Sequence, residues 1–426
     1  MIQKFVTRSI CLCTFALLAA CSTTTSSDVA KDESVGILIF GDSGYHPDYP
    51  DQDDYDDLFT SEGFYQDEWD DWVDDKRPMD EFEARPTTIS PVTGMTVPAS
   101  GLAGVSAAMK HFCSDVATCD FGLMLGDNIY PSGATLGTDG FDDADRFRDM
   151  FTIPLGDIVT EPDSYRTYST LGNHDWETSR EGGFAQIEFL KQAEEFYIDG
   201  PYYTVKPPAG NGDIELFVVD TSMILATQTV YKDRLHDDGS EVIHTVVEPA
   251  EYFVEPMTSD EQRQPQWLEE ALKASTAKWK IVVAHHPIWS SSGSKFYEAK
   301  VIRELMLPAM CKYADAYIVG HEHTLEIHTD DCSVALGAAT EKPLVEIVSG
   351  AAAKQRPTHK TFMQHQEAKY PEHTTIMAEG LLWGFSHMTI SGDTAEVTMM
   401  EIPDDGSSAI SVTHVFEFER RSHLGK

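Results

Sequence analysis

The sequence predicts an α/β fold, and two patterns carry this prediction. Short apolar runs end in polar turns, and continuous runs of this kind are typical of strands buried on both faces of a sheet. The runs and their turns are "VGILIF" before "GDSG", "FGLML" before "GDNIY", "YSTL" before "GNHD", "IELFVVD", "KIVVA" before "HHP", and "DAYIV" before "GHEH". Segments with helical periodicity lie between them, at 101–112, 184–197 and 260–274. Buried strands that alternate with helices indicate a sheet with helices packed against it.

The start of the last of these helices has a local signal. In "TSDEQRQPQWLEEAL", Thr258 and Ser259 are both candidates for the N-cap, because each can accept a hydrogen bond from the first turn. An amphipathic run follows them.

The pattern changes after residue 344. The segments "LVEIVSG", "GFSHMTISGD", "AEVTMMEI" and "SVTHVFEFE" have the pattern of antiparallel strands. We expect them to form a meander that makes a second sheet packed on the first.

The charge of the chain limits its function. The 426 residues include 71 acidic and 31 basic residues, for a formal net charge of −40. Such a surface repels nucleic acid and anionic lipid, so no nucleic-acid binding is expected.

The N-terminus has the pattern of an export signal. Lys4 and Arg8 precede the apolar stretch "ICLCTFALLAA", which is too short to span a bilayer as a stable helix. The stretch ends in "LLAAC", which resembles the lipobox of bacterial lipoproteins. This predicts a signal peptide at 1–20, a lipid anchor on Cys21 and a polar tether at 21–34. The alternative is an ordinary secretory signal with an incidental cysteine.

Four cysteines remain downstream of Cys21: Cys113, Cys119, Cys311 and Cys332. An even number in an exported chain indicates two disulfides. Proximity in sequence favours Cys113–Cys119 and Cys311–Cys332, although the sequence alone leaves the other connectivities open.

Residues 48–83 are densely acidic with interleaved aromatics, and we interpret them as an insertion after the first strand. Asp51, Asp53, Asp57 and Glu62 fall at positions like those of an EF-hand loop. Tyr55 and Asp56 stand where an oxygen ligand and a glycine are expected, so a calcium site is not predicted. The segment is expected to be a solvated or partner-facing lid near the site.

The polar motifs carry the chemistry. In α/β sheets, ligands bind at the carboxyl ends of the strands, where these motifs are expected to converge. The candidate metal ligands among them are Asp42, Asp127, Asn173, His285, His321 and His323. Carboxylate, imidazole and amide groups suit ions such as iron, zinc or manganese. This set exceeds what one tetrahedral ion needs, so two metal ions are predicted.

The ordered motifs "GDSG", "GDNIY", "GNHD", "VVAH" and "GHEH" resemble those of the purple acid phosphatases of the calcineurin-like metallophosphoesterase superfamily. The similarity is to the small, tartrate-resistant type, because no separate β-domain precedes the first motif. It also includes "PYYTV", "FVVDT", "QWLEEAL", "HHPIWS" and "GFSHMTIS", and covers 35–420 apart from the acidic insertion. The resemblance implies a four-layer αββα sandwich of two mixed sheets flanked by helices.

The resemblance also implies a role for each motif. Asp42, Tyr130 and His323 would hold a ferric ion, and Asp127 would bridge both metals. Asn173, His285 and His321 would hold a divalent iron, zinc or manganese ion. His174 would face the substrate phosphate. Relatives often have D-x-H in the first motif, and this chain has Gly44 in place of that histidine, so the phenolate of Tyr130 would supply the missing donor.

The implied activity is hydrolysis of phosphomonoesters at acidic pH, by hydroxide that the metals activate for attack on phosphorus. The general acid for the leaving group stays open, with His286 and Lys295 as candidates. The implied substrates are small phosphate esters, and membrane contact is expected only through Cys21, as a cell-envelope lipoprotein or else as a secreted protein. The alternatives are a phosphodiesterase or nucleotide hydrolase on the same scaffold, and a non-catalytic envelope interaction lipoprotein.

Overall fold

The computed structural model describes residues 34–49, 60–138, 141–160, 164–231, 247–249, 254–293, 295–403 and 409–421. The chain divides into the units Met1–Glu33 and Ser34–Lys426, and every described residue belongs to the second unit. The predicted signal peptide 1–20, Cys21 and all of the tether 21–34 except its last residue lie outside the described residues. The same is true of Asp51, Asp53 and Asp57 in the acidic insertion.

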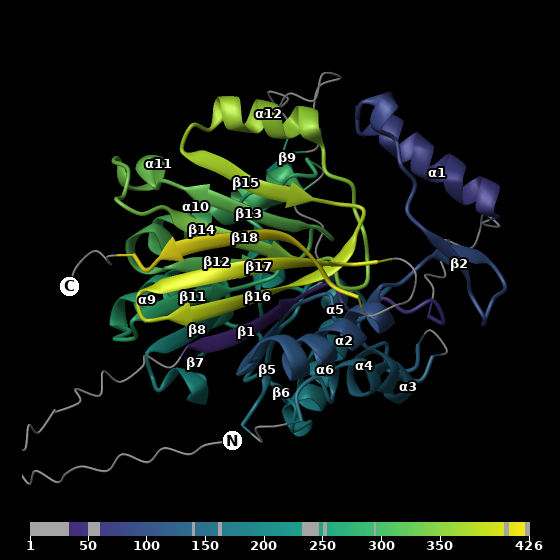
Figure 1. The fold of residues 1–426 in the computed structure, drawn as a ribbon, viewed down its shortest axis with the longest axis horizontal. Coiled ribbons are helices and arrows are strands. Elements are labelled where there is room, and N and C mark those ends of the chain that lie inside the picture. Colours follow the sequence, from purple (N-terminus) through teal and green to yellow (C-terminus); the bar gives the residue numbers. More distant parts are fainter. Residues whose placement is uncertain are drawn as a thin grey trace, which may run out of the picture. The chain divides into compact units, whose positions relative to one another are not determined.

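Within the described residues, the strands form two seven-stranded sheets and two two-stranded ribbons (Figure 1). Sheet A has the order β18 (Ser411–Glu419), β17 (Thr394–Ile402), β16 (Trp383–Ser391), β1 (Val35–Phe40), β4 (Phe121–Leu125), β5 (Thr167–Thr170), β6 (Phe196–Tyr197). Sheet B has the order β15 (His373–Glu379), β13 (Leu325–Asp330), β14 (Leu344–Ser349), β12 (Ala316–Val319), β11 (Trp279–Val283), β8 (Ile214–Val218), β7 (Tyr203–Val205). The ribbons pair β2 (Thr87–Ile89) with β3 (Thr96–Pro98), and β9 (Thr229–Tyr231) with β10 (Val247–Pro249).

The helices connect these strands. The α-helices are α1 (Ser61–Asp74), α2 (Leu102–His111), α3 (Asp143–Phe147), α4 (Ile153–Leu155), α5 (Asn173–Glu177), α6 (Arg180–Gln192), α7 (Thr221–Leu225), α8 (Ser259–Gln262), α9 (Gln264–Ala274), α10 (Phe296–Tyr313), α11 (Ser333–Leu336) and α12 (Lys360–Lys369). Short 3-10 segments lie at Met79–Glu81 and Pro208–Gly210, and π-helical segments at Phe112–Val116 and Arg148–Thr152. None of the described helices is both long and apolar enough to cross a membrane.

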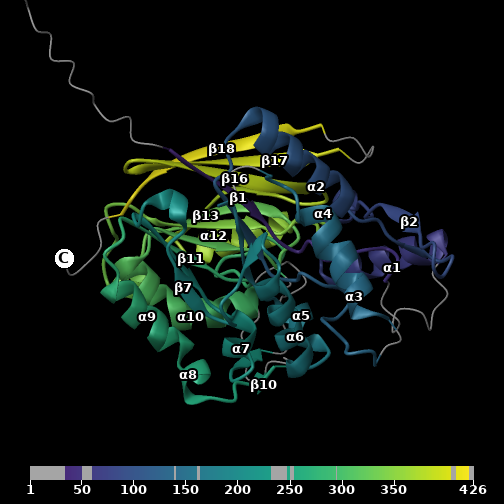
Figure 2. The ribbon, with the colours of Figure 1, turned by 90° about the horizontal axis from the view of Figure 1, so that it is seen from below.

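The two faces of sheet B pack against different partners. Leu216 of β8 lies in the core that also contains Ile39 of β1 in sheet A. The next residue, Phe217, lies in a second core with Leu268 of α9 and Met306 of α10, because neighbouring side chains of a strand point to opposite faces. Figure 2 shows α9 and α10 on one side of sheet B, and strands β16 to β18 with α2 on the other. The predicted four-layer αββα sandwich is therefore confirmed.

The prediction for the segments after residue 344 is wrong in one respect. Strands β16 to β18 do form an antiparallel meander, but β16 also pairs with β1, as in Ile37 with Met388. The meander thus extends the sheet of the first motifs, and β14 pairs in parallel with β12 in sheet B. An alternating pattern shows which side chains face a core, but it does not show which edge a strand joins.

The predicted helices at 101–112 and 184–197 correspond to α2 and α6. The predicted helix at 260–274 is divided at Arg263 into α8 and α9. Pro265 has no amide hydrogen and lies in the first turn of α9, where none is needed. Thr258 is the N-cap of α8: its hydroxyl accepts from the amide of Glu261 at 3.1 Å, and Glu261 accepts from the amide of Thr258 at 2.9 Å.

Both favoured disulfides are present, Cys113–Cys119 and Cys311–Cys332. The described part of the acidic insertion contains α1, which is packed rather than solvated all round. Phe64 and Trp72 of this helix are buried. Arg77, just after α1, donates to the carbonyl oxygens of Pro357 at 3.1 Å and Ser292 at 3.2 Å. Most other residues of α1 are exposed, so the expectation of a solvated or partner-facing lid stays a prediction.

Candidate metal centre

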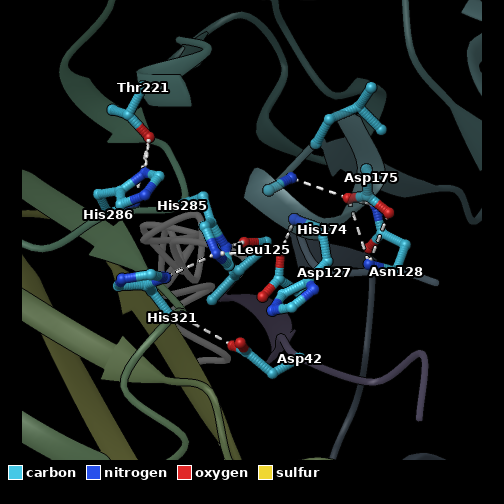
Figure 3. Close-up of polar contacts among 12 residues, drawn as sticks. Asp42, Leu125, Asp127, Asn128, His174, Asp175, Thr221, His285, His286 and His321 are labelled. Carbon is cyan, nitrogen blue, oxygen red and sulfur yellow. Dashed lines mark hydrogen bonds and ion pairs between the residues drawn. The ribbon is translucent and has the colours of Figure 1, made fainter. Parts of the chain in front are cut away.

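The sheets bring the predicted site residues to one edge of the molecule's core. Each lies at the end of a strand: Asp42 after β1, Asp127 and Tyr130 after β4, Asn173 and His174 after β5, His285 after β11, and His321 and His323 after β12. Figure 3 shows Asp42, Asp127, His285 and His321 around a common centre, with His174 beside Asp127. Parallel strands place their carboxyl ends at the same edge, which explains the convergence.

Four of these residues have unusual backbone conformations. The φ angles are 53° at Asp42, 50° at Asp127, 72° at His321 and 50° at His323. Non-glycine residues seldom adopt this left-handed region, and where they do the strain is commonly part of a functional site. Here the sharp turns direct side chains from both sheets into one volume.

One group of donor atoms centres on Tyr130. The Tyr130 hydroxyl lies 2.6 Å from Asp127 Oδ2, 3.1 Å from Asp42 Oδ1 and 3.1 Å from His323 Nε2. His323 Nε2 lies 3.3 Å from Asp42 Oδ1. All four side chains are buried. Donor atoms of Asp42, Asp127 and His323 lie within 4.8 Å of one another, so this group could hold a metal ion.

A second group shares Asp127 with the first. His285 Nε2 lies 3.3 Å from Asp127 Oδ1 and 3.1 Å from His321 Nδ1. Donor atoms of Asp127, His285 and His321 also lie within 4.8 Å of one another. The amide oxygen Oδ1 of Asn173 is buried and has no hydrogen-bond partner among the described residues. A buried acceptor without a partner is costly unless a cation or a proton donor reaches it, so this residue also fits a metal site.

The electrostatics of the site follow from its burial and from the charged groups that surround it. Burial raises the pKa of Tyr130 well above its ordinary value, and Asp127 and Asp42 raise it further. Burial lowers the pKa of both His321 and His323 well below the ordinary value, so both imidazoles are neutral and able to bind metal. Burial opposes protonation of His285, but Asp127, Asp42 and the carbonyl oxygen of Leu125 together outweigh it and raise the pKa of His285 to about 9. A metal ion would take the place of this proton.

Partners outside the donor groups orient two of the histidines. His285 Nδ1 lies 2.8 Å from the carbonyl oxygen of Leu125, which leaves Nε2 facing Asp127. His321 Nε2 lies 3.4 Å from Glu298 Oε2, which leaves Nδ1 facing His285. Such contacts set the tautomer and ring orientation of metal-binding histidines.

His174 lies at the more open side of the site. Its amide donates to Asp127 Oδ1 at 3.0 Å. Its Nδ1 lies 2.5 Å from the carbonyl oxygen of Pro131 and 2.7 Å from Glu177 Oε2, and its side chain is 30% exposed. Nε2 is therefore the ring atom left for a substrate.

The two candidates for the general acid differ in position. His286 is fully buried, its Nδ1 lies 2.7 Å from the hydroxyl of Thr221, and its ring packs on His321. Burial lowers the pKa of His286 to about 3, so it is neutral in mildly acidic solution. Lys295 Nζ is partly exposed and lies 3.8 Å from Glu298 Oε2. Of the two side chains, His286 is enclosed by the protein and Lys295 is partly exposed.

Gly44 is required by its surroundings. A Cβ atom at this position would lie 2.1 Å from the carbonyl carbon of Asn128. No side chain fits there without a shift of the backbone, so this backbone has no room for a histidine at position 44.

The structure also shows polar residues that the sequence analysis did not assign. Asp175 accepts hydrogen bonds from the amides of Asn128 at 2.9 Å and Gly172 at 2.8 Å, and so joins the second motif to the third. Its place in "GNHD" was an available signal. Glu298 had no such signal, because it lies in α10 and meets His321 only through the fold.

The comparison with known proteins agrees with this geometry. The calcineurin-like phosphoesterase family matches residues 99–325, which is more than half of the 426 residues. Purple acid phosphatase 3 of Arabidopsis thaliana is 30% identical over 209 residues, or 49% of each chain. Purple acid phosphatase 17 of the same plant is 28% identical over 237 residues, or 55% of this chain and 59% of that one. The match therefore spans only about half to three-fifths of the length of these relatives.

One solved structure supports the fold alone. GAP50, described as the anchor in the inner membrane complex of Plasmodium, superposes with a TM-score of 0.53 at 12% identity, over 92% of this chain and 90% of that one. The family match covers most of the strands that carry the motifs. The sandwich and the two donor groups that share Asp127 agree with it. The chain belongs to the calcineurin-like phosphoesterase family.

Proposed function

We propose that this protein is a dinuclear-metal acid phosphatase of the purple acid phosphatase type, in its small tartrate-resistant form, and that it hydrolyses phosphomonoesters. The observation that carries the proposal is the position of Tyr130, whose hydroxyl lies within 3.1 Å of Asp42, Asp127 and His323. A tyrosine whose hydroxyl lies among carboxylates can offer its oxygen to a metal ion, whereas a tyrosine that only packs its ring cannot. The similarity to plant purple acid phosphatases supports the proposal.

The donor groups support one assignment of metals. Asp42, Tyr130 and His323 would hold a ferric ion, because a hard phenolate oxygen favours iron in its higher oxidation state. Asn173, His285 and His321 would hold a divalent iron, zinc or manganese ion. Asp127, which belongs to both groups, would join them.

A pair of bound cations supplies Lewis acidity that polarises a phosphoryl oxygen and lowers the pKa of water. The residues of the chain do the rest. His174, held at Nδ1 by Pro131 and Glu177, offers Nε2 to the phosphate and, when protonated, donates a hydrogen bond to it. Lys295 is the candidate to pass a proton to the leaving oxygen.

The test compares the metal-loaded protein on an aryl phosphate and on the corresponding bis-aryl diester. We expect faster turnover of the monoester, and loss of both activities in Asp127→Asn but not in the exposed Asp145→Asn control. Faster cleavage of the diester would contradict monoester specificity and favour a phosphodiesterase or nucleotide hydrolase. A purified protein with neither bound metal nor turnover would favour a non-catalytic envelope protein.

The proposed location is the cell envelope, with the chain exported and anchored through a lipid on Cys21. The two disulfides support export, because disulfides persist in oxidising compartments. Labelled palmitate should enter the wild type and not Cys21→Ser; equal labelling would contradict the anchor, and a secreted soluble protein would indicate an ordinary signal peptide.

A further inference from the structure

Cationic side chains gather beside the candidate metal centre, although the chain has 71 acidic and only 31 basic residues. Arg85 and Arg356 are close enough to Lys354 to act on its ammonium group. Arg356 acts in the same way on Arg77. A local excess of positive charge in a strongly acidic chain points to an anionic ligand.

Lys354 differs from the three arginines of this group. Each arginine has acceptors within the protein: Arg77 donates to backbone carbonyl oxygens, and the other two pair with Glu68 and Glu322. Lys354 has no ion pair and no hydrogen bond within the described part of the chain, and its only described partners are aromatic rings. Its charge is therefore available to a ligand.

The backbone holds Lys354 in place on both sides. The amide of Ala353 donates to the carbonyl oxygen of Asp42 at 3.2 Å, and the amide of Arg356 donates to that of His323 at 3.2 Å. These bonds join the segment after β14 to the first and last metal-binding motifs. Lys354 is thus fixed to the site rather than carried by a free loop.

The side chain of Lys354 lies at the site itself. Its Nζ is 4.2 Å from the centre of the Tyr130 ring and 5.5 Å from that of Tyr45. The His174 ring packs 4.4 Å from the same Tyr130 ring. The half-buried side chain of Lys354 and the partly exposed imidazole of His174 therefore both pack against Tyr130, a member of the first donor group.

We propose that Lys354 binds a phosphoryl oxygen of the substrate and makes the site selective for phosphomonoesters over diesters. A monoester has three non-bridging oxygens and up to two negative charges, whereas a diester has two such oxygens and one charge. An extra cation beside the metals therefore favours the monoester. This inference rests on the proposed function, whose substrate class it explains.

The test uses the full-length metal-loaded protein with the variants Lys354→Gln and Lys354→Arg. Lys360→Gln is the matched control, since it removes one exposed lysine from the same segment. Three quantities are measured: the Kd of inorganic phosphate, kcat/KM for an aryl phosphate and its bis-aryl diester, and metal content. We expect Lys354→Gln to weaken phosphate binding and monoester kcat/KM by about 10-fold or more, the loss of one charge-assisted hydrogen bond. Diester kcat/KM and metal content should be unchanged, and Lys354→Arg should retain most of the affinity.

Two results would overturn the inference. Equal losses of kcat/KM for the monoester and the diester in Lys354→Gln would show that Lys354 does not select between them. Unchanged phosphate affinity in Lys354→Gln would show that Lys354 does not bind the substrate, and a changed metal content in the same variant would assign Lys354 to Tyr130 instead. If the wild type hydrolyses no monoester, the proposed function fails on its own, and the phosphate Kd still decides whether Lys354 binds phosphate.

Discussion

Tyr130 shows how one residue depends on a cation that the chain must acquire. Burial and two carboxylates raise the pKa of its phenol, so the phenol keeps its proton in the metal-free protein. Only a strongly charged cation at the same point can make the phenolate the stable form. The sequence pattern predicted this residue as a ligand, and the structure adds the contacts on which the prediction can be tested.

For Tyr130→Phe we expect loss of the tyrosinate-to-iron charge-transfer band, with the fold retained because the buried ring remains. The visible spectrum and iron content check this result. Tyr45→Phe is the matched control: its ring packs edge-on to Tyr130, but its hydroxyl donates to the carbonyl oxygen of Pro98. A band that survives Tyr130→Phe removes Tyr130 from the metal site.

Glu298→Ala should weaken divalent-metal affinity by about 10- to 100-fold, because His321 loses the carboxylate that orients its ring. Titration of the metal-free protein with zinc gives the affinity. Glu304→Ala, an exposed glutamate of the same helix, should have no effect. Equal zinc affinities in Glu298→Ala and wild type would show that this contact does not position His321.

At the scale of elements, α1 is held by its N-cap, by two buried aromatic side chains and by the residues that follow it. Thr60 caps the helix by accepting from the amide of Gly63 at 3.1 Å, and Phe64 and Trp72 are buried. Arg77 then joins the segment to the loop after Arg356 through backbone carbonyls. The buried guanidinium of Arg77 thus links the acidic insertion to the loop after Arg356, and His359 Nε2, 3.1 Å from the carbonyl oxygen of Asp75, adds a second contact.

Arg77→Ala should release α1 while leaving the sheets intact. The loss of several charge-assisted hydrogen bonds corresponds to about 2–4 kcal/mol of local stability. Hydrogen exchange should therefore rise in 61–74 and stay slow in β1 and β4. Lys360→Gln, which removes the exposed pair with Glu81, should change exchange little. Unchanged protection of α1 from exchange in Arg77→Ala would show that the buried side chains of Phe64 and Trp72 are enough to hold the helix in place.

At the scale of the whole molecule, buried neutral histidines limit stability in acid. His373 is buried, its ring stacks on Trp289 at 4.2 Å, and its Nε2 lies 3.0 Å from His328 Nδ1. Burial lowers the pKa of His373 from 6.5 to about 2, and His328 and Arg303 add to the shift. Because the folded pKa is depressed, stability is present above about pH 6.5 and is lost as the pH falls toward 2.

Between pH 7 and pH 5, His373 should account for about 2 kcal/mol of lost unfolding free energy. His373→Gln should reduce this pH dependence, since glutamine takes up no proton. Denaturant unfolding at the two pH values measures the effect, with the exposed His365→Gln as control. The same slope in His373→Gln and wild type would contradict the assignment.

The sequence by itself determined the α/β class, the order of the motifs and the types of candidate ligand, and it favoured the two disulfide pairings that the structure then established. These features depend on local patterns: apolar runs, turns after strands, and cysteines close together in the chain. The tertiary structure decided the features that depend on strand order. These are the joining of the meander to β1, the sharing of Asp127 between two donor groups, the contact of Glu298 with His321, and the position of Lys354 over Tyr130. Such contacts join residues far apart in the chain, and they arise only when particular sheet edges pair and two sheets pack, which no local pattern specifies.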